Sequence, residues 1–241
     1  MKESLKTVLL PVGTLAASLG GLVLSSQFYT AATGTGNLLN HSHPLAVVLL
    51  IFSAVVLAVQ FLATRKLPTQ GKLEELLPAS PLRGIGCFVG TVGIAYCCIL
   101  NAKFTDFLTI IALVTGIVGG ICLLFVGSQR LFRIEPHYLF YGILTVFFMF
   151  LGLVRCRQWG TETQILRFFF SLIAQVFLLL TVFEYTSVCS SRRNPRSLIF
   201  FSHAAIFFCC VAFPVNYDPF YLTSALWLAL DGCFFKIPQQ E

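Results

Sequence analysis

The stretch that decides the fold covers residues 177–210 and reads FLLLTVFEYTSVCSSRRNPRSLIFFSHAAIFFCC. Two long apolar runs flank a short turn, residues 191–197, that carries three arginines. Basic turns between apolar runs mark the cytoplasmic side of a membrane protein. The stretch therefore predicts two membrane-spanning helices joined by a cytoplasmic turn.

The composition of the whole chain agrees with this prediction. Of its 241 residues, 57% are hydrophobic and only 11% are charged, whereas a soluble domain has about 25% charged residues. A membrane span needs roughly 20 mostly apolar residues. We therefore predict an all-α fold, a single polytopic transmembrane domain over residues 1–241 with eight spans, at 7–29, 44–63, 83–101, 104–127, 136–154, 163–188, 197–213 and 219–236.

The distribution of basic residues predicts the orientation. If the N-terminus is cytoplasmic, only four of the 16 lysines and arginines fall on the outer side, namely Lys103, Arg155, Arg157 and Arg167. This asymmetry favours both termini in the cytoplasm and a location in the cell (plasma) membrane. The net charge of +6 then reflects contact with inner-leaflet lipid and not with nucleic acid. The expected partners are the bilayer and either a membrane protein or a second copy of the chain.

Three ionisable side chains lie inside predicted spans, each close to the cytoplasmic end. They are Glu184, His203 and Asp231. Charged groups in hydrocarbon are costly, so they face the bundle interior and pair, or they extend to the interface. Three roles stay open: the proton or cation site of a transporter, the ligands of a metal in an intramembrane hydrolase, and simple structural pairing.

Two further polar groups are predicted on the outer side. Gln164, Arg167, Ser171 and Gln175 recur at helical spacing and form a polar stripe on the sixth span. Arg155, Arg157 and Trp159 end the fifth span. Arginines and tryptophan at an interface suit the phosphate or carboxylate of a lipid head group or another anion. Plain anchoring is the alternative, with Glu162 or a loop aspartate as the partner of the arginines.

Small residues predict where spans pack closely. A stripe of Gly86, Gly90, Gly93 and Cys97 on the third span, and Gly116 and Gly120 on the fourth, predict that these two spans form a tight pair. A weak internal repeat accompanies them. Cys97 and Cys98 precede Asp106 with the same spacing as Cys209 and Cys210 precede Asp218.

The chain also resembles uncharacterised eight-span bacterial membrane proteins, mainly in its second half. The resemblance rests on four short patterns: HxHP at 41–44, RxW at 157–159, ETQxxRFFF at 162–170 and SRRxxR at 191–196. It implies a polytopic helical fold and no particular activity.

For function, these observations favour a non-enzymatic membrane component, an accessory or scaffold subunit, because the chain contains no catalytic motif. The alternatives are a small-solute or ion/proton-coupled transporter and an intramembrane metal-dependent hydrolase. The nine cysteines show no C-x-x-C pair and no zinc-like spacing with histidine. We therefore predict no metal and no cofactor.

Overall fold

The computed structural model describes residues 2–32, 43–65, 67, 77–78, 80–100, 106–134, 136–160, 168–190 and 195–235, with the side chains of residues 2–7 and 216 left out. Its described part is built from helices and contains no strand. The helices are α1 (Lys2–Ala32), α2 (Pro44–Arg65), α4 (Pro81–Leu100), α5 (Phe107–Leu131), α6 (Tyr138–Gly160), α7 (Phe169–Cys189), α8 (Pro195–Asn216) and α9 (Pro219–Asp231).

Seven of these helices, α1 to α8, are long and apolar enough to cross a membrane. The bundle is therefore that of a multi-pass integral membrane protein, as the composition predicts. The helix α9 has 13 residues, which is about 20 Å at 1.5 Å per residue and shorter than the hydrocarbon core. The sequence places the end of this helix at 236. It ends at Asp231, and Gly232 is its C-cap, with an N–H that donates the last hydrogen bond of the helix, to the carbonyl of Leu228.

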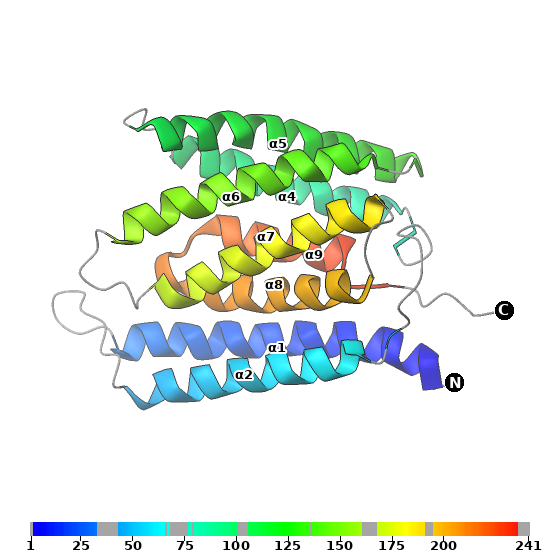
Figure 1. Cartoon of the computed structure of the whole chain (residues 1–241). Coiled ribbons are helices and arrows are strands. Elements are labelled where there is room, and N and C mark those ends of the chain that lie inside the picture. The colour runs from blue at the N-terminus through cyan, green and yellow to red at the C-terminus, as the bar shows by residue number, and fades with distance from the viewer. Residues whose placement is uncertain are drawn as a thin grey trace.

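The helices run roughly parallel and antiparallel to one another along one axis (Figure 1). We call the end of the bundle where α1 begins and α9 ends the proximal end. The opposite end, where α1 ends and α9 begins, is the distal end. The pair α1–α2 lies on one side, the group α4–α5–α6 on the other, and α7, α8 and α9 lie between them.

The central helix is α8, which packs against α1, α2, α7 and α9. Its approach to α1 is close, because a Cβ added at Gly21 would lie 2.8 Å from the Val211 side chain. Ser25 strengthens this contact by donating a hydrogen bond of 2.7 Å to the carbonyl of Val211. The α1–α2 pair is therefore joined to the other helices chiefly through α8.

The glycine stripe of α4 lies close to α9. A Cβ at Gly86, Gly90 or Gly93 would lie within 3 Å of side chains of α9, from Leu230, Trp227 and Thr223 respectively. α4 also packs against α5, through a face that includes Gly84 and Cys87. The prediction of a close α4–α5 pair is confirmed, and two of the predicted glycines take part in it: an added Cβ would lie 3.0 Å from Leu123 of α5 at Gly90 and 2.5 Å from Cys98 of α4 at Gly116. The prediction did not include the contact of the stripe with α9. The stripe makes room for α9.

Large aromatic side chains fill the middle of the bundle between α4, α6 and α9. Phe147, Phe148, Phe220 and Trp227 are buried. The ring of Phe148 lies 6.1 Å from that of Phe220 and 6.5 Å from that of Trp227. This aromatic core separates the polar side chains at the distal end from those at the proximal end.

Candidate functional site

The distal end contains a buried ion pair between α6 and α9. Arg155 lies near the C-terminus of α6, where the helix dipole favours a cation. Asp218 is the N-cap of α9, and its Oδ1 accepts a hydrogen bond of 3.0 Å from the backbone N–H of Phe220. Its Oδ2 accepts a 2.7 Å hydrogen bond from Arg155 Nη2. The same carboxylate thus starts one helix and neutralises the cation at the end of another.

Aromatic rings and a thiol surround the rest of the Arg155 guanidinium. Its carbon lies 4.5 Å from the ring centroid of Phe220 and 4.9 Å from that of Tyr221, which are distances of cation–π contacts. Nη2 also lies 3.8 Å from the sulfur of Cys97. Arg155 is held by side chains from two other helices, α4 and α9, and is 6% exposed.

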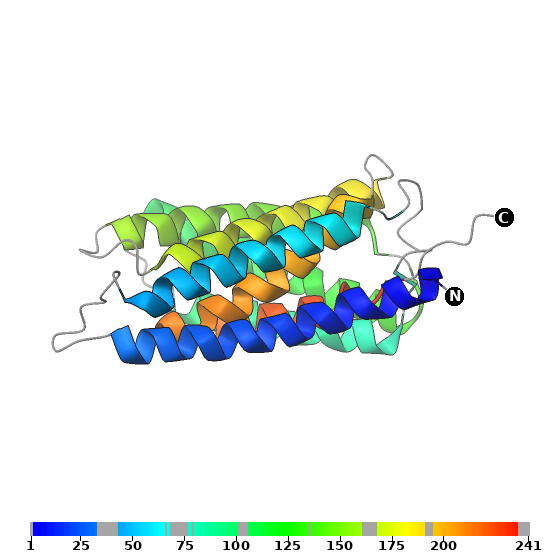
Figure 2. The ribbon, with the colours of Figure 1, turned by 90° about the horizontal axis from the view of Figure 1, so that it is seen from below.

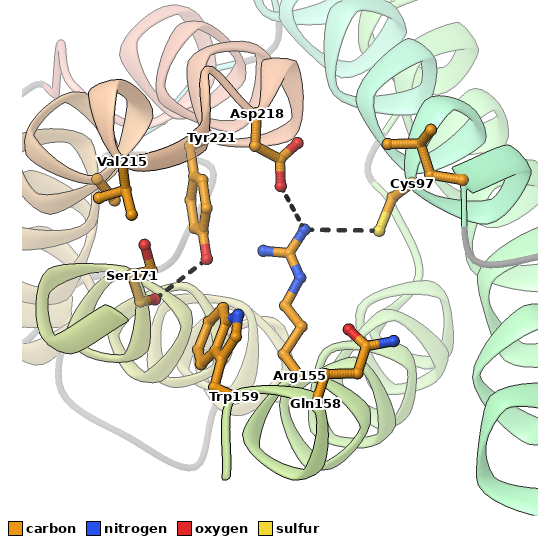
Figure 3. A pocket seen from close by; sticks show the side chains of 10 residues that line it. Cys97, Arg155, Gln158, Trp159, Ser171, Val215, Asp218 and Tyr221 are labelled. Atoms are coloured by element: carbon orange, nitrogen blue, oxygen red, sulfur yellow. Dashed lines mark hydrogen bonds and ion pairs between the residues drawn. The ribbon is translucent and has the colours of Figure 1, made fainter. Parts of the chain in front are cut away.

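A cavity of about 160 Å³ opens beside Arg155. We call it the distal pocket; its lining residues are Cys97, Leu100, Arg155, Gln158, Trp159, Ser171, Ala212, Val215, Asp218 and Tyr221. Figure 3 shows the guanidinium near its centre, between Tyr221 and Cys97. Since a water molecule takes about 30 Å³, the pocket has room for roughly five waters or one small polar group.

One nitrogen of Arg155 at this pocket lacks an acceptor with hydrogen-bond geometry, although the Tyr221 side chain interacts with the same guanidinium. Nη1 is buried and makes no hydrogen bond to any residue that the structure describes. A buried, charged donor without an acceptor costs more than an ordinary unmade hydrogen bond, which is about 1–3 kcal/mol. The pocket therefore contains an ion-paired arginine with one nitrogen, Nη1, that can still donate a hydrogen bond to an oxygen atom.

The other two residues of the predicted outer group lie close by with different partners. Arg157 pairs with Asp106 at 3.2 Å, and its side chain is 58% exposed. Trp159 lines the pocket and stacks on Phe168, with ring centroids 5.2 Å apart. Asp106 and Asp218, which the sequence relates by their spacing after cysteine pairs, thus both meet the end of α6. Glu162, the other expected partner, lies outside the described residues.

Only half of the predicted polar stripe can be placed. Gln164 and Arg167 lie outside the described residues. Ser171 and Gln175 are buried on α7. The carbonyl of Ser171 accepts a hydrogen bond of 3.2 Å from the Tyr221 hydroxyl, and Gln175 Nε2 donates to the carbonyl of Phe148 at 3.2 Å. These two residues tie α7 to α9 and α6.

A second polar group, which we call the proximal cluster, surrounds Asp231 at the end of α9. It comprises Arg83, Arg130, Tyr141, Tyr185 and Asp231, all buried. Arg130 lies 3.7 Å from Asp231 and donates to the carbonyl of Leu77 at 2.8 Å. Arg83 donates to the carbonyl of Phe234. The cluster holds two guanidinium groups and one carboxylate, and it fixes the C-terminal end of α9 to α4 and α5.

Glu184 and His203 have partners of their own. Glu184 Oε2 accepts a hydrogen bond of 2.9 Å from Ser197, across the basic turn. His203 Nδ1 lies 2.7 Å from the carbonyl of Ile199, and Nε2 lies 3.8 Å from the sulfur of Cys233. Among the described residues, no group of three or more histidine, cysteine, aspartate or glutamate side chains is arranged to hold a metal.

Comparisons of the chain with protein-family models, with curated proteins and with solved structures find no match. The chemistry of the two polar groups therefore has to be read from their geometry.

Sequence reasoning missed Asp218 as a site residue and treated Arg83 and Arg130 only as markers of orientation. Arginines near span ends are typical of topology signals, so nothing distinguished these two from exposed ones. A signal for Asp218 was present in the dipeptide Asp218-Pro219, which is typical of a helix start. That Asp218 meets Arg155, 63 residues earlier, depends on where the folded bundle places the end of α6 and the start of α9.

Proposed function

We propose that the chain is a non-enzymatic component of the cell membrane that binds a carboxylate or phosphate group in the distal pocket. The observation that carries this proposal is the Nη1 nitrogen of Arg155. It is buried, has no hydrogen-bond acceptor among the described residues, and lies at a cavity of about 160 Å³. A guanidinium matches the geometry of carboxylate and phosphate oxygens better than any other side chain.

The surroundings of Arg155 favour a ligand that accepts a directed hydrogen bond over anions that are attracted only by charge. Asp218 holds Nη2 at 2.7 Å and so fixes the guanidinium plane. Because the pair is neutral, attraction at long range is weak, and binding depends on the directed hydrogen bond from Nη1. The pocket is small, so it accepts only the polar group, while any attached chain leaves through the opening. A lipid head group and a small soluble anion both fit this description.

The packing between the two polar groups supports binding over transport. The aromatic core of Phe147, Phe148, Phe220 and Trp227 is buried and lies between them. A carrier in this conformation would need a polar path past these rings. The accessory or scaffold role therefore remains the preferred proposal, with the bilayer as the first partner and a membrane protein or a second copy of the chain as the next.

We extend the proposal to eight crossings with both termini in the cytoplasm. The segment from Asp218 to Asp231 starts at the distal end, where Asp218 contacts Arg155, and ends at the proximal end, where Asp231 contacts Arg130. It thus follows the length of the bundle although α9 itself is short. Arg83, Arg130, Arg133 and Arg196 lie at helix ends of the proximal side, which the positive-inside rule assigns to the cytoplasm. The distal pocket would then face outward.

The test is ligand-dependent thermal stabilisation of the purified protein. Inorganic phosphate, glycerol phosphate and acetate probe soluble anions, while nanodiscs with and without phosphatidylglycerol probe a head group. We expect one of these arms to raise the melting temperature of the wild type and not of Arg155→Lys, which keeps the charge but loses the second amino group.

Arg157→Lys serves as the matched control, because this arginine lies two residues away in an exposed pair. It should respond like the wild type. Stabilisation of Arg155→Lys as strong as that of the wild type in every arm would refute the proposal, and so would the absence of any stabilisation of the wild type.

A further inference from the structure

A second cavity lies between α1 and α2, far from the distal pocket. Figure 2 shows the two helices close together near the distal end and diverging toward the proximal end. The space between them, which we call the α1–α2 groove, measures about 620 Å³. Most of its lining is apolar, with Leu10 and Ala17 on α1 and Val56 and Ala63 on α2 among the lining residues.

Two polar side chains, Thr14 and Gln60, line the groove, and the amide of Gln60 is 3% exposed. Its Nε2 donates to Thr14 Oγ1 at 3.3 Å and to the backbone carbonyl of His203 at 3.4 Å. Since a carbonyl can only accept, these contacts fix the amide with its nitrogen toward α8. Its oxygen, Oε1, is buried and has no hydrogen-bond partner in the part of the chain that the structure describes.

An unpartnered acceptor in an apolar, membrane-facing groove would be stabilised by a donor from outside the chain. In the hydrocarbon of a bilayer, water is absent, and the cost of an unmade hydrogen bond is not relieved by solvent. A plain acyl chain would fill the volume and leave Oε1 unsatisfied. A chain that carries a hydroxyl group would satisfy both the volume and the acceptor.

The size of the groove fits a lipid chain. A volume of 620 Å³ lies within the range of about 300–1,000 Å³ that is typical of small-molecule sites. Gly13 borders the groove, and among the described residues no atom beyond its own helical turn lies within 4 Å of the position of an added Cβ.

We infer that the α1–α2 groove binds the apolar chain of a hydroxyl-bearing lipid, whose O–H donates to Gln60 Oε1. This site is independent of the distal pocket and of the function proposed for it. The lipid fills the space at Gly13 and rests against α1 and α2, and its hydroxyl reaches the floor where Gln60 meets Thr14.

The experiment uses a long-chain alcohol that carries a photoactivatable diazirine, and its methyl ether as the ligand control. Full-length protein in native-lipid-depleted detergent micelles is labelled, and the labelled peptides are mapped by mass spectrometry. We expect labels from the alcohol on α1 and α2 around residues 9–17 and 55–63. The ether lacks the donor, so its labelling should be about five-fold weaker, as the loss of one hydrogen bond implies.

Two leucine variants on α1 distinguish binding in the α1–α2 groove from non-specific contact of the helix with lipid. Gly13→Leu has open space around its Cβ and the higher helix propensity, so it should fold, fill part of the groove and reduce labelling by about ten-fold or more. Ala16→Leu changes an exposed residue of the same helix that does not line the groove, and it should label like the wild type. Gln60→Met should remove the difference between the alcohol and the ether.

Three results would overturn the inference. The first is equal labelling of wild type and Gly13→Leu. The second is equal labelling by the alcohol and its ether in the wild type. The third is a stoichiometric membrane protein cross-linked to the groove in place of lipid.

Discussion

Asp218 is expected to stabilise the bundle in two separable ways, as the counter-ion of Arg155 and as the N-cap of α9. Asparagine caps a helix as well as aspartate does, so Asp218→Asn removes only the charge. This leaves the Arg155 guanidinium buried without a counter-ion, which costs about 3–5 kcal/mol for a buried pair. Because the Asp218 side chain is 21% exposed, water screens part of this cost, and we expect the lower end, about 3 kcal/mol.

Asp218→Ala removes the cap as well, which adds about 1 kcal/mol. The difference in free energy of unfolding between the two variants therefore measures the hydrogen bond from the Phe220 N–H to Asp218 Oδ1. The loss of stability that both variants share measures the ion pair. The double variant Arg155→Met/Asp218→Asn removes both charges and should regain most of the lost stability, since a buried pair replaced by apolar groups is often neutral.

The chain provides its own probe for this measurement. Seven of its nine cysteines are buried, namely Cys87, Cys97, Cys98, Cys122, Cys209, Cys210 and Cys233. Equilibrium unfolding in detergent can therefore be followed by the reaction of these thiols with a fluorogenic dye. An Asp218→Asn variant as stable as the wild type would refute the role of the ion pair. A double variant less stable than Asp218→Asn would refute the claim that the uncompensated charge is the cause.

Three further predictions use the same unfolding measurement. Asp231→Asn should cost about 3–5 kcal/mol, because Arg83 and Arg130 would lose the carboxylate of the proximal cluster; a loss below 1 kcal/mol would show that Asp231 does not compensate them. Gly93→Ala should lower the free energy of unfolding by about 1–3 kcal/mol, since its Cβ would lie 2.0 Å from Thr223 Oγ1. Gly13→Ala should instead raise the free energy of unfolding by up to about 1 kcal/mol. Equal effects of the two variants would contradict the packing of α4 on α9. Arg157→Gln should change stability by less than about 0.5 kcal/mol, because both partners of its pair are well exposed, and a larger loss would indicate a contact that the exposed pair does not account for.

The sequence predicts the helices of this protein well because each long apolar run has a single way to satisfy its backbone in a membrane. It places the end of α9 five residues too late. The apolar run continues through Cys233, Phe234 and Phe235, and hydrophobicity alone does not reveal that the helix stops at Asp231. At this end Gly232 is the C-cap, and Arg83 and Arg130 contact the carbonyl of Phe234 and the carboxylate of Asp231, which are tertiary contacts that hydrophobicity does not report.

Helix faces and charge partners are harder to predict than spans. The stripe of Gly86, Gly90 and Gly93 indicates a close approach, but a helix with two packed faces does not reveal which neighbour each face meets. The sequence marks Arg155 as a binding residue from its position at the outer end of a span. It does not distinguish the buried Arg155 from the exposed Arg157, because the two residues lie on the same turn. In the structure each of them pairs with an aspartate from another part of the chain.

The claim that the distal pocket binds an oxyanion can be tested most directly by locating one there. Crystals of the purified protein soaked in arsenate, a phosphate analogue with a strong anomalous signal, would show the position of the arsenic atom. We predict a peak in the pocket with an arsenate oxygen about 3 Å from Arg155 Nη1, and no peak in crystals of Arg155→Lys. A wild-type pocket that holds only water, or an equal peak in the lysine variant, would contradict the account.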